Sequence, residues 1–121
     1  MCEITLYDSF NSDFQEKYGT YKKIDNVFYD ESLEFKELSI GTNEKKEIIF
    51  ISCEKPEMST TKNIHVGNSF DEVIDKYGGN YYIYRDMGMD DSINFVDRES
   101  RIHFQFYYQD DQITKIVLQE M

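Results

Sequence analysis

The sequence predicts an α+β fold in which a helix followed by an antiparallel β-meander occurs twice. The stretch GNSFDEVIDKYGG, residues 67–79, has a weaker copy in DSFNSDFQEKYGT, residues 8–20. β-branched and aromatic residues are abundant in the segments after each copy, as is typical of strands. We therefore expect two degenerate helix-then-meander repeats that form a continuous or paired antiparallel sheet, with the helices on one side.

The second copy carries the signature of a short amphipathic helix. Ser69 is placed to cap the first turn, and Glu72 follows three residues later to complete a capping box. Apolar residues at 70, 73, 74 and 77 follow the spacing of one buried helix face, and Gly78 supplies a stop. In the first copy Ser9 stands at the capping position, and Ser12 replaces the acid of the capping box.

Strand-like segments follow each predicted helix. In the second half they cover residues 80–86, 92–97, 101–108 and 112–119. In the first half they cover residues 26–30, 32–40 and 47–54, with a bulge or bend expected near Lys36 and Glu37. Alternation along residues 101–108 places Phe104 and Phe106 on the core face, and His103 on the opposite face.

These patterns predict one domain over residues 1–121. Repeat 1 spans residues 1–55, repeat 2 spans residues 63–121, and a linker at 56–62 begins with Pro56, the sole proline. A chain of 121 residues buries enough surface to fold without a disulfide or a metal. We expect Cys2 and Cys53 to be reduced thiols in a cytoplasmic protein.

The chain is strongly acidic. It has 24 Asp and Glu residues against 13 Lys and Arg residues, a formal charge of −11 and a pI near 4.5. Binding to nucleic acid or to an anionic membrane needs a basic face, so both are disfavoured. The sequence has no apolar run near the ~20 residues that a membrane span requires.

No pattern in the sequence predicts a catalytic or metal site. Two histidines and two cysteines do not supply the closely spaced ligands of a zinc site. Residues 86–92, DMGMDDS, do not have the order of acids and glycine found in a calcium loop. A small hydrolase that uses a carboxylate pair such as Asp97 and Glu99 is a less favoured interpretation, because such pairs arise by composition in an acidic chain. We expect no cofactor, no metal and no enzymatic activity.

The junction between the two halves resembles a known family. EIIFISCEKPEMSTTKNIHVGNSFDEVIDKYG, residues 47–78, is similar to the junction in tandem-repeat proteins of the β-lactamase-inhibitor-protein-like type and in their small outer-membrane lipoprotein relatives. The closing strands, with Ile102-His103-Phe104 and residues 113–118, follow the same pattern over the second copy. The resemblance implies helix-plus-sheet repeats with a concave surface, and a role in binding proteins or scaffolding envelope assemblies.

Tyrosines and carboxylates adjoin one another on the strands predicted for the second half. Tyrosine combines a large rigid contact area with a polar tip and is enriched at protein interfaces. Filling of the core or of a sheet edge is an equally weighted explanation for these tyrosines. The candidate partner-binding residues are Tyr82, Tyr84, Asp86, Asp97 and Tyr107.

A surface of this kind suits a basic protein partner. The leading hypothesis is an immunity protein that binds and neutralises a nuclease-type bacterial toxin domain, whose phosphate-binding active site is positively charged. The alternative is a non-enzymatic envelope or regulatory scaffold of the lipoprotein-repeat type. A signal peptide and lipobox encoded upstream of Cys2 would favour the alternative.

Overall fold

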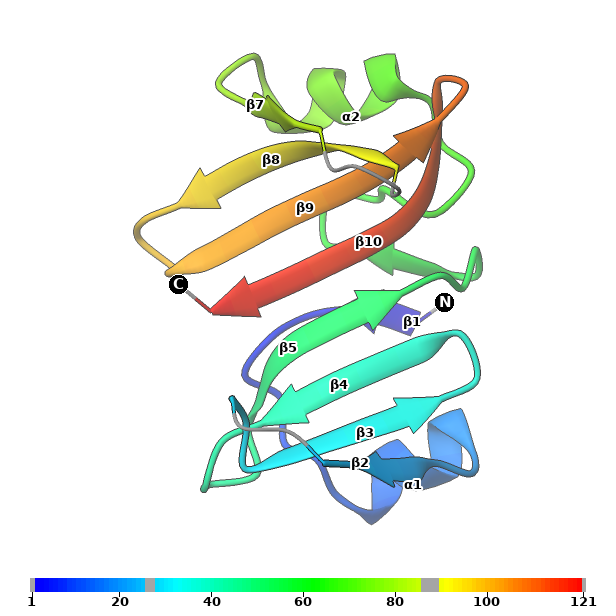
Figure 1. Cartoon of the computed structure of the whole chain (residues 1–121), viewed down its shortest axis with the longest axis vertical. Coiled ribbons are helices and arrows are strands. Elements are labelled where there is room, and N and C mark those ends of the chain that lie inside the picture. The colour runs from blue at the N-terminus through cyan, green and yellow to red at the C-terminus, as the bar shows by residue number, and fades with distance from the viewer. Residues whose placement is uncertain (1, 26–27, 86–89, 121) are drawn as a thin grey trace.

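One antiparallel sheet of eight strands dominates the computed structural model, which describes residues 2–25, 28–85 and 90–120 (Figure 1). The strand order is β2-β3-β4-β5-β10-β9-β8-β7. Its strands are β2 (Lys22–Ile24), β3 (Glu31–Phe35), β4 (Leu38–Thr42), β5 (Ile48–Cys53), β7 (Tyr82–Tyr84), β8 (Asp91–Asp97), β9 (Ile102–Gln109) and β10 (Gln112–Glu120). The remaining elements are the helices α1 (Ser12–Tyr18) and α2 (Phe70–Tyr77), and a parallel pair of strands, β1 (Cys2–Ile4) and β6 (Met58–Thr60).

The predicted α+β class is wrong, because the chain has a mainly-β fold. Within the described part of the chain, the strands hold 52 residues and the two helices 15. The two helices have only seven and eight residues, and they lie at the two ends of the sheet without forming a helical layer on one side (Figure 1). Within the part of the chain that the structure describes, no helix has the length and apolar character needed to cross a membrane.

The sheet consists of two meanders joined at its centre. The first half contributes α1 followed by β2 to β5, and the second half contributes α2 followed by β7 to β10. The last strands of the two halves, β5 and β10, pair antiparallel, with Cys53 opposite Ile116 and Ile51 opposite Leu118. Strands that come at the same point in the two halves, such as β4 and β9, therefore lie at equal distances from the centre of the sheet.

The doubled phrase in the sequence forms the same set of backbone hydrogen bonds in each half, which we call the clip. The N–H of Tyr7 donates to the carbonyl of Ile48, and the Ile48 N–H donates back to the carbonyl of Asp8. In the second half Gly67 donates to Ile113, whose N–H donates back to Asn68. Tyr7 and Gly67 both have positive φ, at 72° and 103°. Each clip attaches the segment before a helix to the final hairpin of its half.

Both final hairpins also carry a bulge at the same position relative to the clip. The extra residue is Ile49 on β5 in the first half and Thr114 on β10 in the second, each directly after the clip residue Ile48 or Ile113. Counting from the two clips, Ile40 on β4 corresponds to Phe106 on β9. These matched irregularities give a residue-by-residue correspondence between the halves.

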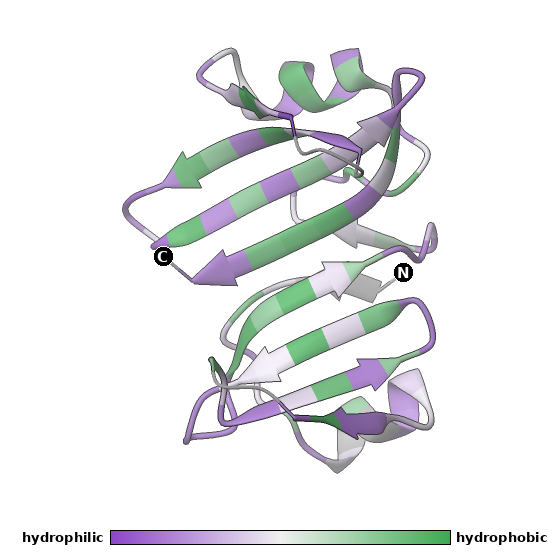
Figure 2. Cartoon of the chain, viewed as in Figure 1, coloured by the Kyte–Doolittle hydropathy of each residue, from purple (hydrophilic) through white to green (hydrophobic). Residues whose placement is uncertain are grey.

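One face of the sheet forms the core, and we call the opposite face the open face. Along β9, apolar and polar residues alternate, as Figure 2 shows. Phe106 is fully buried, while Phe104 and Tyr108 are half-buried against the core, which confirms the alternation predicted for this strand. The rings of Phe14 from α1 and Tyr77 from α2 both contact this core face.

Helix α2 confirms its predicted start. The Ser69 hydroxyl accepts from the Glu72 N–H, and the Glu72 carboxylate accepts from the Ser69 N–H. Helix α1 begins later than predicted, at Ser12, because the side chain of Asn11 and not that of Ser9 accepts the Phe14 N–H.

Three differences concern the strands of the first half and the linker. Residues 32–40 form two strands, because the expected bend at Lys36 and Glu37 is a tight turn in which Glu37 has a φ of 59°. Residues 28–30 form a bend, and 26–27 lie outside the described residues. The segment 56–62, predicted to be a linker, contains the buried strand β6, which pairs with β1.

The clip predicts a specific cost for adding a side chain at Gly67. An added Cβ meets no atom within 4 Å there, so the penalty comes from the backbone, whose φ of 103° L-residues rarely adopt. We expect Gly67→Ala to lower the free energy of unfolding by about 1–2 kcal/mol in urea titrations. Gly79→Ala is the control, because Gly79 lacks a positive φ and its Cβ is also unobstructed. Equal losses of unfolding free energy in Gly67→Ala and Gly79→Ala would contradict the conclusion that the clip requires a positive φ at Gly67.

Candidate functional site

The open face of the second half places polar and aromatic side chains in rows across the strands. Pairing puts Ser92 of β8 between Tyr84 of β7 and Tyr107 of β9. In the adjacent row, Asn94 lies between Tyr82 and Gln105. Because residues paired across strands share a face, the three tyrosines project to the open side of the sheet.

A hydrogen-bond network connects the side chains of this face. Its centre is His103, whose Nε2 lies 2.9 Å from Asn94 Oδ1 and whose Nδ1 lies 3.3 Å from Gln119 Nε2. Asn94 Nδ2 donates to the Ser92 hydroxyl at 3.0 Å, and Gln105 Nε2 donates to the same hydroxyl at 3.2 Å. Ser92 and Asn94 are buried at 0% and 1% exposure, so their polar atoms need these partners. The network fixes the surface from which the tyrosines project.

The partners of His103 fit a neutral imidazole. With the amide orientations of the structure, Gln119 donates to Nδ1 and Nε2–H donates to Asn94. Burial lowers the pKa of His103 from its ordinary value of 6.5, because desolvation penalises the imidazolium. Both nitrogens are therefore engaged structurally, which leaves this histidine poorly suited to act as a general base.

Large side chains are exposed around the short strand β7, and we define the β7 edge patch as Tyr81, Tyr82, Tyr84 and Val96. Their exposures are 36%, 50%, 53% and 45%, respectively. Tyr82 and Tyr84 lie on the open face, with the Tyr82 ring stacked over His103 at a centroid distance of 6.4 Å. Tyr81 turns to the core side and contacts Phe70 and Phe95. The patch therefore wraps around the edge of the sheet.

A hollow of about 810 Å³ adjoins this patch on β8 beyond the end of β7. Aromatic rings of Tyr77, Phe95 and Phe104 line it, together with the charged side chains of Lys62 and Asp97. The Lys62 ammonium lies 4.9 Å from the centroid of the Tyr77 ring. Because β7 pairs only with Ser92 to Asn94, the next residues of β8 are not paired with it. The hollow therefore extends the β7 edge patch along β8, with aromatic rings and charged side chains in its lining.

The structure brings part of the predicted site together. Tyr82, Tyr84 and Tyr107 share the open face, although the ring of Tyr107 is covered by the Lys115 ammonium at 4.5 Å. Asp97 lies at the end of β8 and lines the hollow with Tyr82. The backbone N–H groups of Ser100 and Glu99 donate to Asp97 Oδ1 at 3.3 and 3.1 Å, and the interaction with Ser100 is the main cause that holds the pKa of Asp97 below its ordinary value. Asp86 lies outside the described residues.

Sequence reasoning missed the network around His103 as a unit. Alternation along residues 101–108 places His103 and Gln105 on the face opposite the core, so the sequence indicated the position of these two members of the network. Asn94 and Gln119 join it only through the pairing of β8, β9 and β10. Long-range register of this kind is not contained in a local pattern.

The Cys53 thiol occupies a structural position in the core. Cys53 is fully buried, and burial raises the pKa of its thiol to about 11, which suppresses the nucleophilic thiolate. Its Sγ lies 3.6 Å from Met58 Sδ, inside the core. Among the described residues, no group of three or more His, Cys, Asp and Glu side chains is arranged to hold a metal ion.

Comparison with known proteins shows a likeness in fold. No family model and no curated protein matches the chain. A solved structure, the uncharacterized protein yfeY from Escherichia coli, is similar over 90% of this chain and 87% of its own, with a TM-score of 0.53 and 10% sequence identity. At this identity the likeness concerns the fold alone.

The position of His103 predicts a pH dependence of stability. In the unfolded chain His103 binds a proton near pH 6.5, whereas in the folded chain it binds one only at lower pH. The neutral, buried His103 therefore contributes to the free energy of unfolding above pH 6.5, and this contribution is lost as the pH falls. We expect the free energy of unfolding to fall less between pH 8 and pH 5 in His103→Gln than in the wild type. Urea titrations at both pH values measure this difference. Identical losses in the two proteins would refute the assignment.

Proposed function

We propose that this protein binds another protein through the β7 edge patch, and that the partner is a basic, nuclease-type bacterial toxin domain that it neutralises. The observation that carries the binding part is the exposure of Tyr82, Tyr84 and Val96 together at one edge of the sheet. Tyrosines in such positions supply much of the energy of protein interfaces.

The polar network supports this proposal because it anchors the side chain on which Tyr82 is stacked. Tyr82 is stacked on His103, and His103 is fixed by Asn94 and Gln119. A surface that is ordered before binding loses less conformational entropy on association. The neighbouring hollow offers space for a side chain of the partner.

The charge of the whole chain supports a basic partner more than the charge of the patch does. The chain has a net charge of −11. Around the patch, however, acidic and basic side chains alternate: Arg85 pairs with Asp91 at 3.9 Å, and both Lys62 and Asp97 line the hollow. Long-range attraction would therefore accelerate the encounter, while the tyrosines would determine the lifetime of the complex.

The test is an affinity purification from the lysate of the source organism at low salt, in which the wild type is compared with Tyr82→Ala/Tyr84→Ala. We expect a basic protein at near-equal stoichiometry that a salt step elutes, and at least about tenfold weaker binding of the purified partner to the double variant. Phe28→Ala is the matched control, because Phe28 is an exposed aromatic residue of the first half, at 83% exposure.

Three outcomes would contradict parts of the proposal. A purified partner that binds the double variant as tightly as the wild type would exclude the β7 edge patch. Binding that is indifferent to salt would exclude a charge-steered encounter with a basic partner. Recovery of envelope components in place of a basic toxin domain would favour the scaffold alternative.

A further inference from the structure

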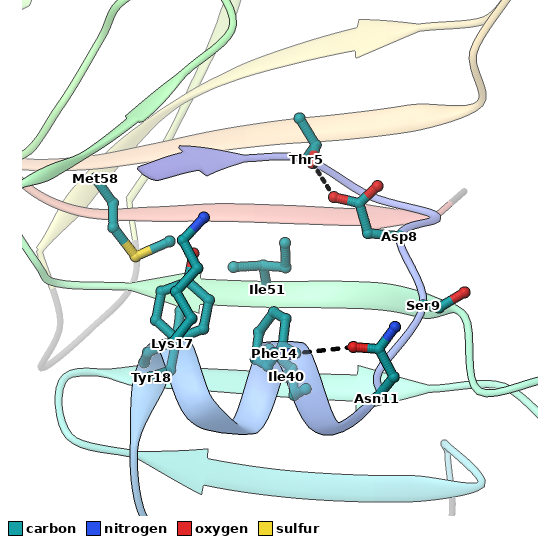
Figure 3. A pocket seen from close by; sticks show the side chains of 11 residues that line it. Thr5, Asp8, Ser9, Asn11, Phe14, Lys17, Tyr18, Ile40, Ile51 and Met58 are labelled. Carbon is teal, nitrogen blue, oxygen red and sulfur yellow. Dashed lines mark hydrogen bonds between the residues drawn. The ribbon is translucent and has the colours of Figure 1, made fainter. Parts of the chain in front are cut away.

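A second hollow lies in the first half, between α1, the segment after β1 and the core face of the sheet (Figure 3). Its volume is about 330 Å³, at the lower end of the range for small-molecule sites. Ile40, Ile51 and Met58 form an apolar floor, and each is at most 4% exposed. Phe14 and Lys17 of α1 line one wall.

The two halves differ at the positions that form the floor of this hollow. The residues of β9 that correspond to Leu38 and Ile40 of β4 are Phe104 and Phe106. In the second half the ring of Tyr77 packs on both phenylalanines, at 5.4 and 5.1 Å between centroids. On β4 the corresponding side chains are smaller and aliphatic, and the hollow lies over them.

Two opposite charges lie at the mouth of the hollow. Figure 3 shows Lys17 and Asp8 on either side of the apolar floor. The Thr5 hydroxyl donates to Asp8 Oδ2 at 2.6 Å, and the clip holds the backbone of Asp8 through Ile48. The Lys17 ammonium lies 5.7 Å from the centroid of the Tyr18 ring. The lining thus has a cationic side, an apolar floor and an anionic side.

We propose that this hollow binds a small zwitterion in which an apolar body separates a carboxylate from an ammonium group. The carboxylate pairs with Lys17, the ammonium pairs with Asp8, and the body covers Ile40 and Ile51. A ligand with a single charge pairs with only one of the two protein charges and is repelled by the other. This site is separate from the β7 edge patch, so it is independent of the proposed function.

Three matched probes test the charge requirement: 6-aminohexanoate, hexanoate and hexylamine, each titrated up to about 10 mM by isothermal calorimetry and amide NMR. We expect 6-aminohexanoate to bind with one-to-one stoichiometry and at least about threefold more tightly than either singly charged probe. Shifted amide signals should come from α1 and the strands of the floor. Equal or tighter binding of a singly charged probe, or no binding of 6-aminohexanoate, overturns the proposal.

Two variants of the chain locate the site. Ile40→Phe introduces the side chain that the second half has at the corresponding position, so it should fill the hollow and abolish binding of 6-aminohexanoate. Lys17→Met removes only the ammonium of an exposed side chain and should reduce 6-aminohexanoate binding to the level of hexylamine. If Ile40→Phe does not fold, Lys17→Met decides the question. Unchanged binding in a folded variant of either kind refutes the site.

Discussion

The pairing of β5 with β10 is the interaction on which the rest of the structure depends. Without it, each half is a meander that ends in a long unpaired edge, which is prone to association with other chains. The register that places Ile51 opposite Leu118 and Cys53 opposite Ile116 also aligns the apolar faces of the two meanders. A shift of one residue would turn the apolar side chains of one half to the open face. This pairing therefore makes a single core from two short repeats, each of which contributes a small helix.

The repeated clip explains why similar phrases occur twice in the chain. Each clip requires a residue with positive φ, and the second half uses Gly67, for which this conformation carries little cost. The first half uses Tyr7, whose backbone is less favourable there, but its hydroxyl donates to the carbonyl of Ser100 in the other half at 3.4 Å. The two copies thus use different residues, Tyr7 and Gly67, at the position that needs a positive φ. The first copy accepts local strain and gains a contact between the halves.

The parts of the fold that local patterns determine could be predicted from the sequence, and those that long-range pairing determines could not. The capping box at Ser69 and the alternation along β9 depend on neighbouring residues, and both were predicted correctly. Strands β1, β2 and β6 have three residues each, too few for a periodic pattern, and their assignment depends on partners elsewhere in the chain. The class itself was wrong for another reason: α1 and α2, with seven and eight residues, are too short to form a helical layer beside an eight-stranded sheet. For the candidate site, the tyrosines of β7 were found from composition, whereas Asn94 and Gln119 join His103 only through the sheet register.

The differences between corresponding positions give the two halves their separate surfaces. On the open face Tyr107 of β9 corresponds to Gly41 of β4. A Cβ added at Gly41 would lie 2.7 Å from the ring of Tyr29, so this ring covers Gly41. The first half thus places a tyrosine from a loop where the second half has a tyrosine from β9. Next to it, Phe50 packs on Tyr29 at 5.4 Å, whereas the corresponding Lys115 covers Tyr107. On the core face Phe106 corresponds to the smaller Ile40, which lines the hollow beneath α1. Because the backbone scaffold is held by the clips and by the central pairing, side chains at these positions can differ without changing the fold. A duplicated unit can in this way present an exposed aromatic edge at one end and a small charged hollow at the other.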